Sequence, residues 1–191
     1  RSYSVTGVQT CALPIYDSWC KTTNRPGSTL GGAASGWLPM IHHLTDPKGV
    51  SRLVIFDRGE DDRLIQSVSE DGGVTWSPMR PNGLRGIEPS MNIIATRDGK
   101  RLLMWNTDWT PGVFQAESAD GGLTWTNERD VIDVSGLPGV RMIEPGVIRS
   151  PDGAQLLMLI RDFAKGAAYN SLYSVSGDGG GEFFEIGRAH V

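Results

Sequence analysis

The sequence predicts an all-β protein made of repeated four-stranded antiparallel sheets. An eight-residue pattern, Ser-x-Asp-Gly-Gly-x-Thr-Trp, occurs at Ser69 to Trp76 and again at Ser118 to Trp125. Its two aspartates, Asp71 and Asp120, lie 49 positions apart, and a repeat of this length is typical of a modular array. Glycine accounts for 25 of the 191 residues, which favours tight turns between strands over helices.

The residues of this pattern suit a tight turn between two strands. A segment of alternating polar and apolar residues precedes each copy, and Thr-Trp is expected to begin the next strand. The glycines can take a positive φ, which strains residues with a Cβ, and the aspartates can accept hydrogen bonds from turn amides. We therefore assign structural roles to Ser69, Asp71, Gly73, Thr75 and Trp76, and to Ser118, Asp120, Gly122, Thr124 and Trp125.

Two further repeats support a modular architecture. A third copy of the pattern, SGDGGGEF, gives Ser176 and Asp178 the same structural roles but has Glu and Phe in place of Thr and Trp. The segment from Glu88 to Asn106 lines up with that from Glu144 to Asp162. Each unit reads as Glu-Pro, a strand, an Asp-Gly turn, an apolar strand, a polar strand and the aspartate pattern, which makes one four-stranded sheet.

Turn signals divide the chain into short predicted strands. No window has an apolar period of 3.6 residues, so little helix is expected. The predicted strands are 37–45, 51–58, 63–69, 74–78, 90–96, 101–107, 112–118, 123–127, 144–149, 154–161 and 170–176.

The aspartate pattern resembles the Asp-box, or bacterial neuraminidase repeat, and the chain resembles the sialidase superfamily of β-propellers. In a propeller, four-stranded blades surround a central axis. The resemblance implies a partial β-propeller, with about three blades of a six-bladed sialidase-type propeller. Because propellers close with about 4–8 blades, such a piece is expected to expose the flanks of its end blades.

Both ends of the chain are expected to be sequencing artefacts. Residues 5–15 (VTGVQTCALPI) read as the translated reverse complement of a common sequencing adapter, and residues 185–191 (EIGRAHV) read as its forward strand. We therefore assign 1–15 and 185–191 to adapter and 16–184 to the partial propeller. On this interpretation Cys20 is the single cysteine, no disulfide is predicted, and the chain itself is expected to be inactive.

Composition and charge argue against several classes of function. The net charge of −4 gives no support to nucleic-acid binding, and no apolar run approaches the roughly 20 residues that span a membrane. His42 and His43 are neighbours in a predicted strand and face opposite ways, so neither a metal site nor a cofactor is expected. The compartment and the oligomeric state cannot be read; a secreted or periplasmic parent is compatible with the resemblance.

The resemblance to sialidases implies specific chemistry. Members bind the sugar carboxylate with arginines, whose planar guanidinium makes two parallel hydrogen bonds to it. An Asp acts as acid/base, and a Glu activates a Tyr nucleophile. Here Trp37-Leu38-Pro39 stands where Arg-Ile-Pro is expected, so one arginine is missing. The Tyr nucleophile and another arginine would come from later blades.

Five residues are candidates for that chemistry. Arg58 ends a predicted strand and would bind substrate, while Asp61 or Asp62 in the following loop would protonate the leaving oxygen; a solvated turn is the alternative. Arg161 interrupts the apolar run LLMLI and would also bind substrate, and Glu144 would polarise the nucleophile.

The last two candidates have structural alternatives as well. Arg161 could instead pair with its neighbour Asp162. The repeat places Glu88 where the next unit has Glu144, and a Glu common to two units could be a structural start to the strand.

The leading hypothesis is that the parent is an exo-sialidase-like glycoside hydrolase that cleaves terminal sialic acid, or a related anionic sugar, from glycans or sialoglycoconjugates. The first alternative is a non-catalytic Asp-box propeller that binds glycan or protein, which the missing arginine favours. The second is a different propeller glycosidase, which would show paired carboxylates and no arginine cluster.

Overall fold

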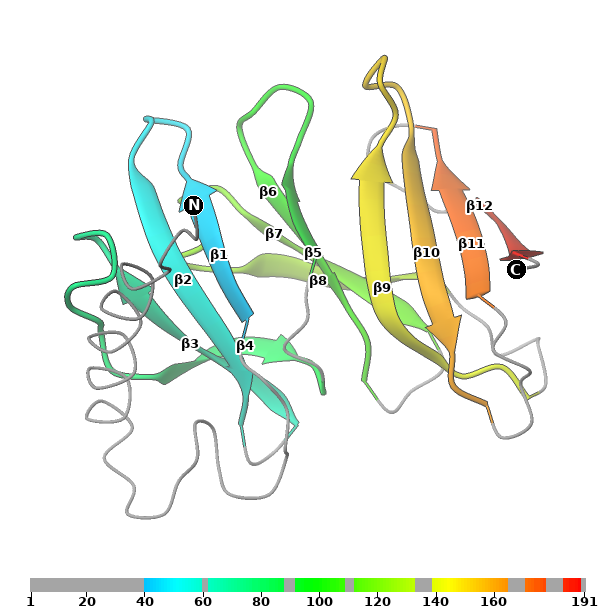
Figure 1. The fold of residues 1–191 in the computed structure, drawn as a ribbon, viewed down its shortest axis with the longest axis horizontal. Helices are drawn as coiled ribbons and strands as arrows, with labels where there is room; N and C mark the ends of the chain where they lie inside the picture. The colour runs from blue at the N-terminus through cyan, green and yellow to red at the C-terminus, as the bar shows by residue number, and fades with distance from the viewer. Residues whose placement is uncertain are drawn as a thin grey trace, which may run out of the picture.

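The computed structural model of the chain describes residues 40–59, 62–87, 92–108, 112–132, 139–164, 171–177 and 184–189. These ranges contain strands and turns and no helix, so the all-β prediction is confirmed. The strands form three four-stranded antiparallel sheets, in the orders β1-β2-β3-β4, β5-β6-β7-β8 and β9-β10-β11-β12 (Figure 1). We call them sheets 1, 2 and 3. No helix within the described part of the chain could span a membrane.

Each sheet is built from strands that follow one another in sequence. Sheet 1 contains β1 (Met40–Thr45), β2 (Ser51–Arg58), β3 (Arg63–Ser69) and β4 (Arg80–Arg85). Sheet 2 contains β5 (Asn92–Ala95), β6 (Leu102–Asn106), β7 (Val113–Ser118) and β8 (Thr126–Ile132). Sheet 3 contains β9 (Met142–Arg149), β10 (Leu156–Asp162), β11 (Ser171–Ser176) and β12 (Phe184–Ala189).

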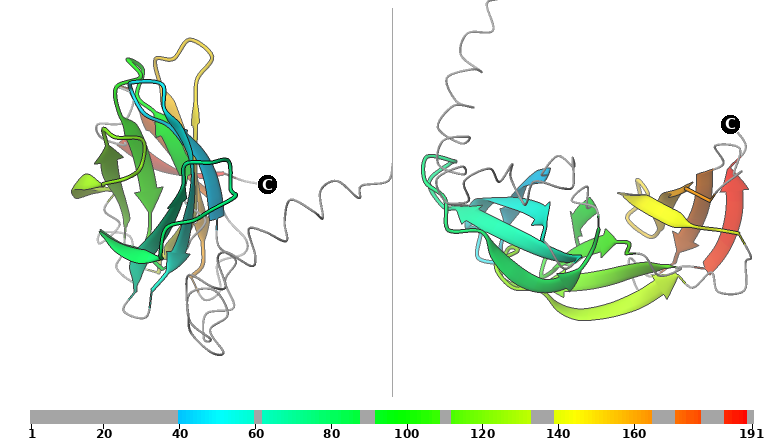
Figure 2. Two further views of the ribbon diagram at one scale, coloured as in Figure 1. Left: turned by 90° about the vertical axis from the view of Figure 1, so that its left-hand side faces the viewer. Right: turned by 90° about the horizontal axis from the view of Figure 1, so that it is seen from below.

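The three sheets are arranged as consecutive blades. Seen from below, they follow one another along an arc, with the first strand of each sheet, β1, β5 and β9, on the concave side (Figure 2). Sheet 2 contacts sheet 3 mainly through β9. The predicted fold class, a partial β-propeller, is confirmed.

The sheets share one register, which makes their residues directly comparable. In each sheet the serine that begins the aspartate pattern pairs with a leucine of the second strand: Ser69 with Leu53, Ser118 with Leu102, and Ser176 with Leu156. Residues counted from these three leucines therefore occupy equivalent positions.

Alternate side chains of the second strands pack in opposite directions, as the pleat of a strand requires. The first core joins Val54 and Phe56 of β2 to Leu102 and Met104 of β6. The second core joins Leu103 and Trp105 of β6 to Leu156, Met158 and Ile160 of β10. The middle sheet thus contributes one face to each core.

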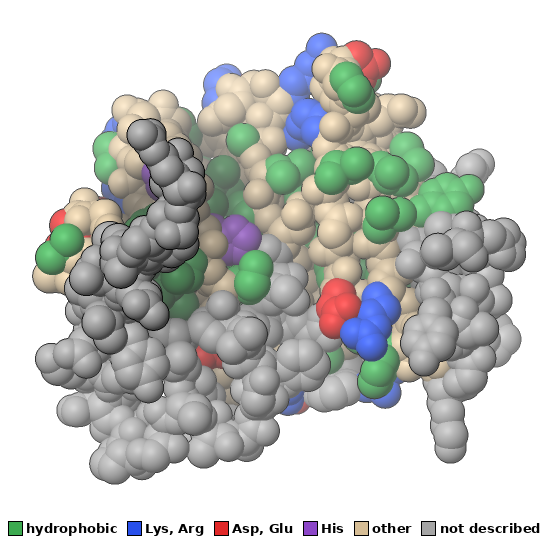
Figure 3. Space-filling view, viewed as in Figure 1, with side chains coloured by type: hydrophobic (Ala, Val, Ile, Leu, Met, Phe, Trp, Pro, Cys, Tyr) green, Lys and Arg blue, Asp and Glu red, His purple; other side chains and the backbone are tan. Residues whose placement is uncertain are grey.

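Sheet 3 repeats these apolar positions on a face that no described residue covers. Leu159 corresponds to Trp105, yet it is 47% exposed, whereas Trp105 is 0% exposed. Ile148 on the same face is 60% exposed. Hydrophobic side chains accordingly gather over this sheet in Figure 3. The expectation that an end blade exposes its flank holds for this sheet.

The two complete copies of the aspartate pattern form matching turns after the third strand of their sheets. We call them the first aspartate turn (Ser69–Trp76) and the second aspartate turn (Ser118–Trp125). In the first, the carboxylate of Asp71 accepts bonds from the amide (2.8 Å) and hydroxyl (2.6 Å) of Thr75. In the second, Asp120 accepts the same two bonds from Thr124, at 3.0 and 2.5 Å.

Serine and glycine complete both turns. The amide of Gly73 donates to the Ser69 hydroxyl, and the amide of Gly122 donates to the Ser118 hydroxyl, both at 2.8 Å. Gly122 has φ +88°, and a Cβ there would lie 2.5 Å from Leu44 Cδ1 of sheet 1. Glycine is therefore required both for the backbone and for the contact between sheets.

The fourth strands begin later than the sequence predicts. Strands were expected at 74–78 and 123–127, but β4 begins at Arg80 and β8 at Thr126. Trp76 explains the late start of β4. Its ring is buried against Ile55 on one face of sheet 1, and its indole N–H donates to the Gly73 carbonyl at 3.1 Å. Burial of the ring holds residues 74–79 outside the strand.

Several sequence predictions fall at the ends of the described ranges. Strand β12 contains residues that the sequence assigns to adapter; that assignment concerns their origin and stays a prediction. Ser176 ends β11 and is fully buried, whereas Asp178 lies outside the described residues. The segment with Cys20 and Trp37 also lies outside them.

We expect replacement of Asp71 by Asn to destabilise the chain in a pH-dependent way. Bonds from the Thr75 side chain and amide lower the pKa of Asp71 from 3.8 to about 2. The ionised form therefore contributes stability that is complete above pH 3.8 and is lost as the pH falls through 2. Urea unfolding should show a gap between wild type and Asp71→Asn at pH 7 that closes towards pH 2.

The exposed flank of sheet 3 predicts a contrast between two leucines. Leu103→Ala should cost about 2–5 kcal/mol of unfolding free energy, because it empties a site in the second core. Leu159→Ala, on the open face, should cost less than about 1 kcal/mol. Equal costs in urea unfolding would contradict the assignment of the two faces.

Candidate functional site

The two predicted substrate-binding arginines occupy equivalent positions at one end of the arc. Arg58 lies five residues after Leu53, and Arg161 lies five residues after Leu156. Both therefore stand where the second strand ends, at the lower end of the sheets in Figure 1. The aspartate turns lie at the other ends of these strands, so the structural motif and the candidate site are separate. In sheet 2 the equivalent residue is Thr107.

Arg161 and Glu144 form an ion pair between β10 and β9. Arg161 Nη1 donates to Glu144 Oε1 at 2.8 Å, with the side chains 54% and 35% exposed. Arg161 thus pairs with Glu144 rather than with Asp162, whose carboxylate accepts the amides of Arg141 and Ala164. Basic and acidic side chains gather at this end of sheet 3 in Figure 3.

A β-bulge lies at Glu144, next to Ile143, which is the residue that pairs with Arg161. The register of β9 against β10 shifts between Leu159 and Arg161, and Glu144 has φ +54°. Positive φ is uncommon outside glycine, and bulges occur frequently beside active sites, where they redirect a side chain. Pro145 follows directly within β9 and has no amide N–H to donate to a neighbouring strand.

The alignment of Glu144 with Glu88 is not supported by the strand register. Asn92 pairs with Trp105, and Gly146 pairs with Leu159, so Asn92 and Gly146 are equivalent. Glu88 precedes Asn92 by four residues, whereas Glu144 precedes Gly146 by two. The two glutamates thus differ in their sequence distance from the equivalent residue, and Glu88 itself lies outside the described residues.

An aromatic ring and a second arginine adjoin this pair. Phe163 is 51% exposed, and the guanidinium carbon of Arg161 lies 5.3 Å from the centre of its ring. That of Arg141 lies 5.7 Å from the same centre. Both distances are within the range of cation–π attraction, so the Phe163 ring helps to hold the two guanidinium groups at the end of β10.

Arg58 pairs with one of its predicted acidic neighbours. Its Nε and Nη2 both donate to Asp62 Oδ1, the first at 2.9 Å. Asp62 has φ +58°. The predicted substrate-binding arginine and the predicted acid/base thus form one ion pair, and an acid/base role requires them to separate. Asp61 lies outside the described residues.

The sequence did not single out Asp57, a fully buried carboxyl beside Arg58. Its Oδ1 accepts the Arg58 amide at 2.7 Å, and among the described residues Oδ2 has no hydrogen-bond partner. Burial raises the pKa of Asp57 from 3.8 to about 6, and the bond from the Arg58 amide opposes part of that rise. The sequence signal that could have identified Asp57 is a charged residue directly after the apolar run in LVIFDR.

Arg85 is a second residue that the sequence did not single out. It ends β4, and its guanidinium binds three acids of sheet 2: Glu128 at 2.7 Å, Asp130 at 2.8 Å and Asp108 at 3.3 Å. Its guanidinium carbon also lies 4.6 Å from the ring centre of Phe114. These contacts join sheets 1 and 2, so the role of Arg85 is structural.

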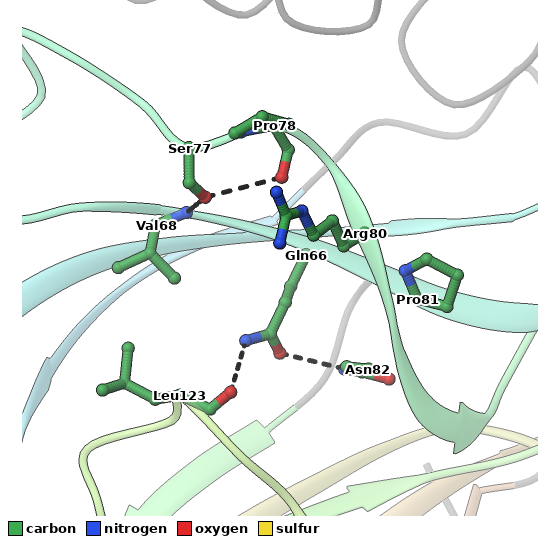
Figure 4. A pocket seen from close by; sticks show the side chains of 8 residues that line it. All are labelled: Gln66, Val68, Ser77, Pro78, Arg80, Pro81, Asn82 and Leu123. Atoms are coloured by element: carbon green, nitrogen blue, oxygen red, sulfur yellow. Dashed lines mark hydrogen bonds between the residues drawn. The ribbon is translucent and has the colours of Figure 1, made fainter.

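A shallow cavity of about 200 Å³ lies away from the candidate site, on the outer strands of sheet 1. Gln66 donates to the carbonyls of Gly122 and Leu123 and accepts a bond from Asn82. Figure 4 shows this side chain extending from β3 to the second aspartate turn. Because its amide is fully used in joining sheets 1 and 2, the cavity is a feature of that junction.

Within the described ranges, no three His, Cys, Asp or Glu side chains are placed to hold a metal ion. The functional groups at the candidate site are guanidinium groups, carboxylates and the exposed ring of Phe163.

Comparison with known proteins gives structural matches only. No family model and no curated protein matches the chain. An endo-arabinase from Bacteroides thetaiotaomicron is similar, with a TM-score of 0.56, 18% identity, and coverage of 87% of this chain and 66% of the other.

Two other solved structures are similar as well. An endo-1,5-α-L-arabinanase from Thermotoga petrophila has a TM-score of 0.56 and 14% identity, over 78% of this chain and 40% of the other. An α-L-arabinofuranosidase from Podospora anserina, solved with cellotriose, has a TM-score of 0.53 and 12% identity, over 76% and 48%. At these identities the likeness shows the fold, and the chain spans between 40 and 66% of the three proteins.

We expect the Glu144–Arg161 pair to contribute little to stability. Half-exposed pairs are typically worth less than about 1 kcal/mol. A double-mutant cycle on the unfolding free energy, with Glu144→Gln and Arg161→Gln, should therefore give a coupling below that value. The same cycle for Glu128→Gln and Arg85→Gln should give a larger coupling, because these two side chains are less exposed, at 24% and 28%, and their charges are less screened by solvent.

Proposed function

We propose that the chain is part of a propeller glycoside hydrolase that cleaves terminal sialic acid, or a related anionic sugar, from glycans. The general class is supported by the arabinan-cleaving enzymes and the arabinofuranosidase among the similar structures. Fold likeness alone does not fix function, so the anionic substrate has to be argued from the site. Because the chain spans only part of those proteins, the activity is proposed for the whole parent protein.

The observation that carries the proposal is the presentation of Arg161. Glu144 holds its Nη1, and its guanidinium lies against Phe163. Its Nε and Nη2 have no hydrogen-bond partner among the described residues, and the side chain is half exposed. These two N–H groups form the edge of a guanidinium that meets a carboxylate with two parallel bonds. A sugar carboxylate is the group that this edge suits.

The remaining roles follow from position. Arg58, at the equivalent position of sheet 1, would provide a second contact to the anionic sugar once it leaves Asp62. Asp62, or Asp61 in the same loop, would then protonate the leaving oxygen. Glu144 would polarise a Tyr nucleophile supplied by another part of the parent protein. The aspartate turns would be Asp-boxes, with a structural role only.

A non-catalytic propeller that binds glycan or protein is the second candidate. The pairing of Arg58 with Asp62 favours it, because an acid/base that is held by a guanidinium needs a further step before it can donate a proton. A binding protein needs only Arg161 and the exposed ring of Phe163, which is available for stacking on a sugar.

The test is an assay of the full-length gene product on a fluorogenic sialoside. We expect turnover, and we expect Arg161→Lys to lower kcat/KM by about 10–100-fold, because lysine keeps the charge but loses the two-bond geometry. Arg101→Lys is the matched control, since Arg101 forms an exposed ion pair with Glu117 at the other end of sheet 2. Its kcat/KM should be unchanged.

Other outcomes separate the alternatives. Binding of sialosides without turnover would support the non-catalytic propeller. Turnover of neutral arabinan or galactan, with no effect of Arg161→Lys, would replace the proposal with a different propeller glycosidase. No binding and no turnover, with Arg58 and Arg161 both intact, would remove the anionic-sugar proposal.

A further inference from the structure

The cavity on the outer strands of sheet 1 has a single ionisable side chain in its lining. The lining comes from β3, from β4 and the segment that leads to it, and from Leu123 of the second aspartate turn. Arg80 is the only charged residue among the described residues of this lining. An anion in the cavity would therefore meet a guanidinium and no acid of the lining.

The other polar side chains of the lining are used within the fold. Gln66 donates both amide N–H groups to carbonyls of the second aspartate turn. The Ser77 hydroxyl accepts the Val68 amide at 2.9 Å, and the Ser77 amide donates to the Val68 carbonyl at 2.8 Å. Asn82 donates to Gln66 Oε1 and accepts the Leu84 amide, both at 3.1 Å. These bonds fix the frame of the cavity and leave Arg80 as the group that can bind a ligand.

Arg80 is placed to reach a ligand in the cavity. It pairs with Gln66 across β3 and β4, so the two side chains lie on the same face. Figure 4 shows the Arg80 side chain extending from β4 toward β3. Arg80 is exposed, and among the described residues it has no hydrogen bond or ion pair. It differs in this from Arg85 at the other end of β4, which binds three acids.

Apolar side chains form the rest of the lining. Val68 comes from β3, Leu123 is 38% exposed, and Pro78 and Pro81 lie on either side of Arg80 in the sequence. Proline fixes φ, so this part of the wall needs little ordering when a ligand binds. The volume of about 200 Å³ is smaller than the roughly 300–1,000 Å³ of sites for drug-sized ligands, so the cavity suits an anionic group with a few carbon atoms.

A carboxylate is the anion that fits one guanidinium. The planar edge of the guanidinium donates two parallel N–H bonds, and the two oxygens of a carboxylate accept them. A phosphate group carries more charge and a third acceptor oxygen, and the described lining contains no second cation to match it.

We propose that this cavity is a binding site for a carboxylate on a short apolar chain, with Arg80 binding the carboxylate. The apolar chain packs against Val68, Leu123 and the two prolines. A free short-chain acid and the C-terminal residue of a peptide both present this chemistry. The site is separate from the Glu144–Arg161 pair, and it does not depend on the proposed glycosidase activity.

The experiment is a ligand titration of the full chain, followed by nitrogen–proton correlation NMR. The probes are isovalerate, its neutral amide isovaleramide, and acetyl-alanyl-leucine with a free C-terminal carboxylate. Isovalerate should shift the Arg80 Nε–H signal and the backbone amides of Ser77 and Leu123, with a dissociation constant on the order of 1–10 mM. Isovaleramide should bind at least about 10-fold more weakly, because it cannot form charge-assisted bonds to the guanidinium.

Three variants locate the binding. Arg80→Gln should weaken isovalerate binding by at least about 10-fold. Arg161→Gln removes the other open guanidinium edge and should leave the shift of the Leu123 amide unchanged. Leu123→Glu adds a carboxylate to the lining while Arg80 stays in place, and it should also weaken binding, because the added charge repels the ligand or occupies Arg80.

The outcomes assign the source of the ligand or reject the site. Binding of isovalerate alone assigns the cavity to free acids, and binding of the peptide, with or without isovalerate, assigns it to peptide C-termini. Unchanged affinity in Arg80→Gln, equal affinity for isovaleramide, or no shift with either carboxylate at about 50 mM would overturn the proposal. If Arg80→Gln does not fold, the wild-type Arg80 Nε–H signal decides: a shift with a carboxylate probe and none with isovaleramide supports the site, and any other pattern rejects it.

Discussion

The hydrogen bonds of the aspartate turns fix the register on which the three-sheet arrangement depends. Ser69 and Ser118 end the third strands, and their hydroxyls both hold the turn and mark the residue that pairs with the second strand. Because side chains alternate, a slip of one residue would exchange the two faces of a sheet. In sheet 2 it would turn Leu103 and Trp105 away from sheet 3. The turns therefore influence the packing between sheets, and Trp125 of the second aspartate turn is itself part of the first core.

The same register places the polar candidate residues at the ends of the second strands. Counting from the paired leucine, the fourth and fifth positions of the second strand are Asp57-Arg58 in sheet 1 and Asn106-Thr107 in sheet 2, and the fifth position in sheet 3 is Arg161. The backbone is equivalent at these positions while the chemistry differs. Asn106 makes the same backbone contact as Asp57 without a charge, and Thr107 occupies the position of Arg58 and Arg161, so this backbone does not require charged residues at either position. This contrast between equivalent positions supports assigning function to the ends of β2 and β10.

Much of the fold could be predicted because its signals are local. The aspartate turns depend on residues within eight positions of one another, and the alternation of β6 and β10 is visible in the sequence. The start of β4 could not be placed, because burial of Trp76 against Ile55 is a contact between residues far apart in the sequence. The partners of the candidate residues were also beyond local inference. Glu144 meets Arg161 beside a bulge that shifts the register, and Asp57 is fully buried although a charged residue is expected at the surface.

The backbone at Glu144 gives an independent reason to look for function there. Asp62 and Glu144, the acidic partners of the two arginines, both have positive φ, at 58° and 54°. Aspartate adopts this region fairly readily, since its short side chain can bond to the local backbone, but glutamate does not share that advantage. A residue held in this region costs on the order of 1–3 kcal/mol, whereas a half-exposed ion pair returns less than about 1 kcal/mol. The Glu144–Arg161 pair therefore does not offset the strain of its own backbone. A strained conformation that stability does not explain, at the end of a strand and beside an arginine with an open edge, is more consistent with a binding role than with a structural one.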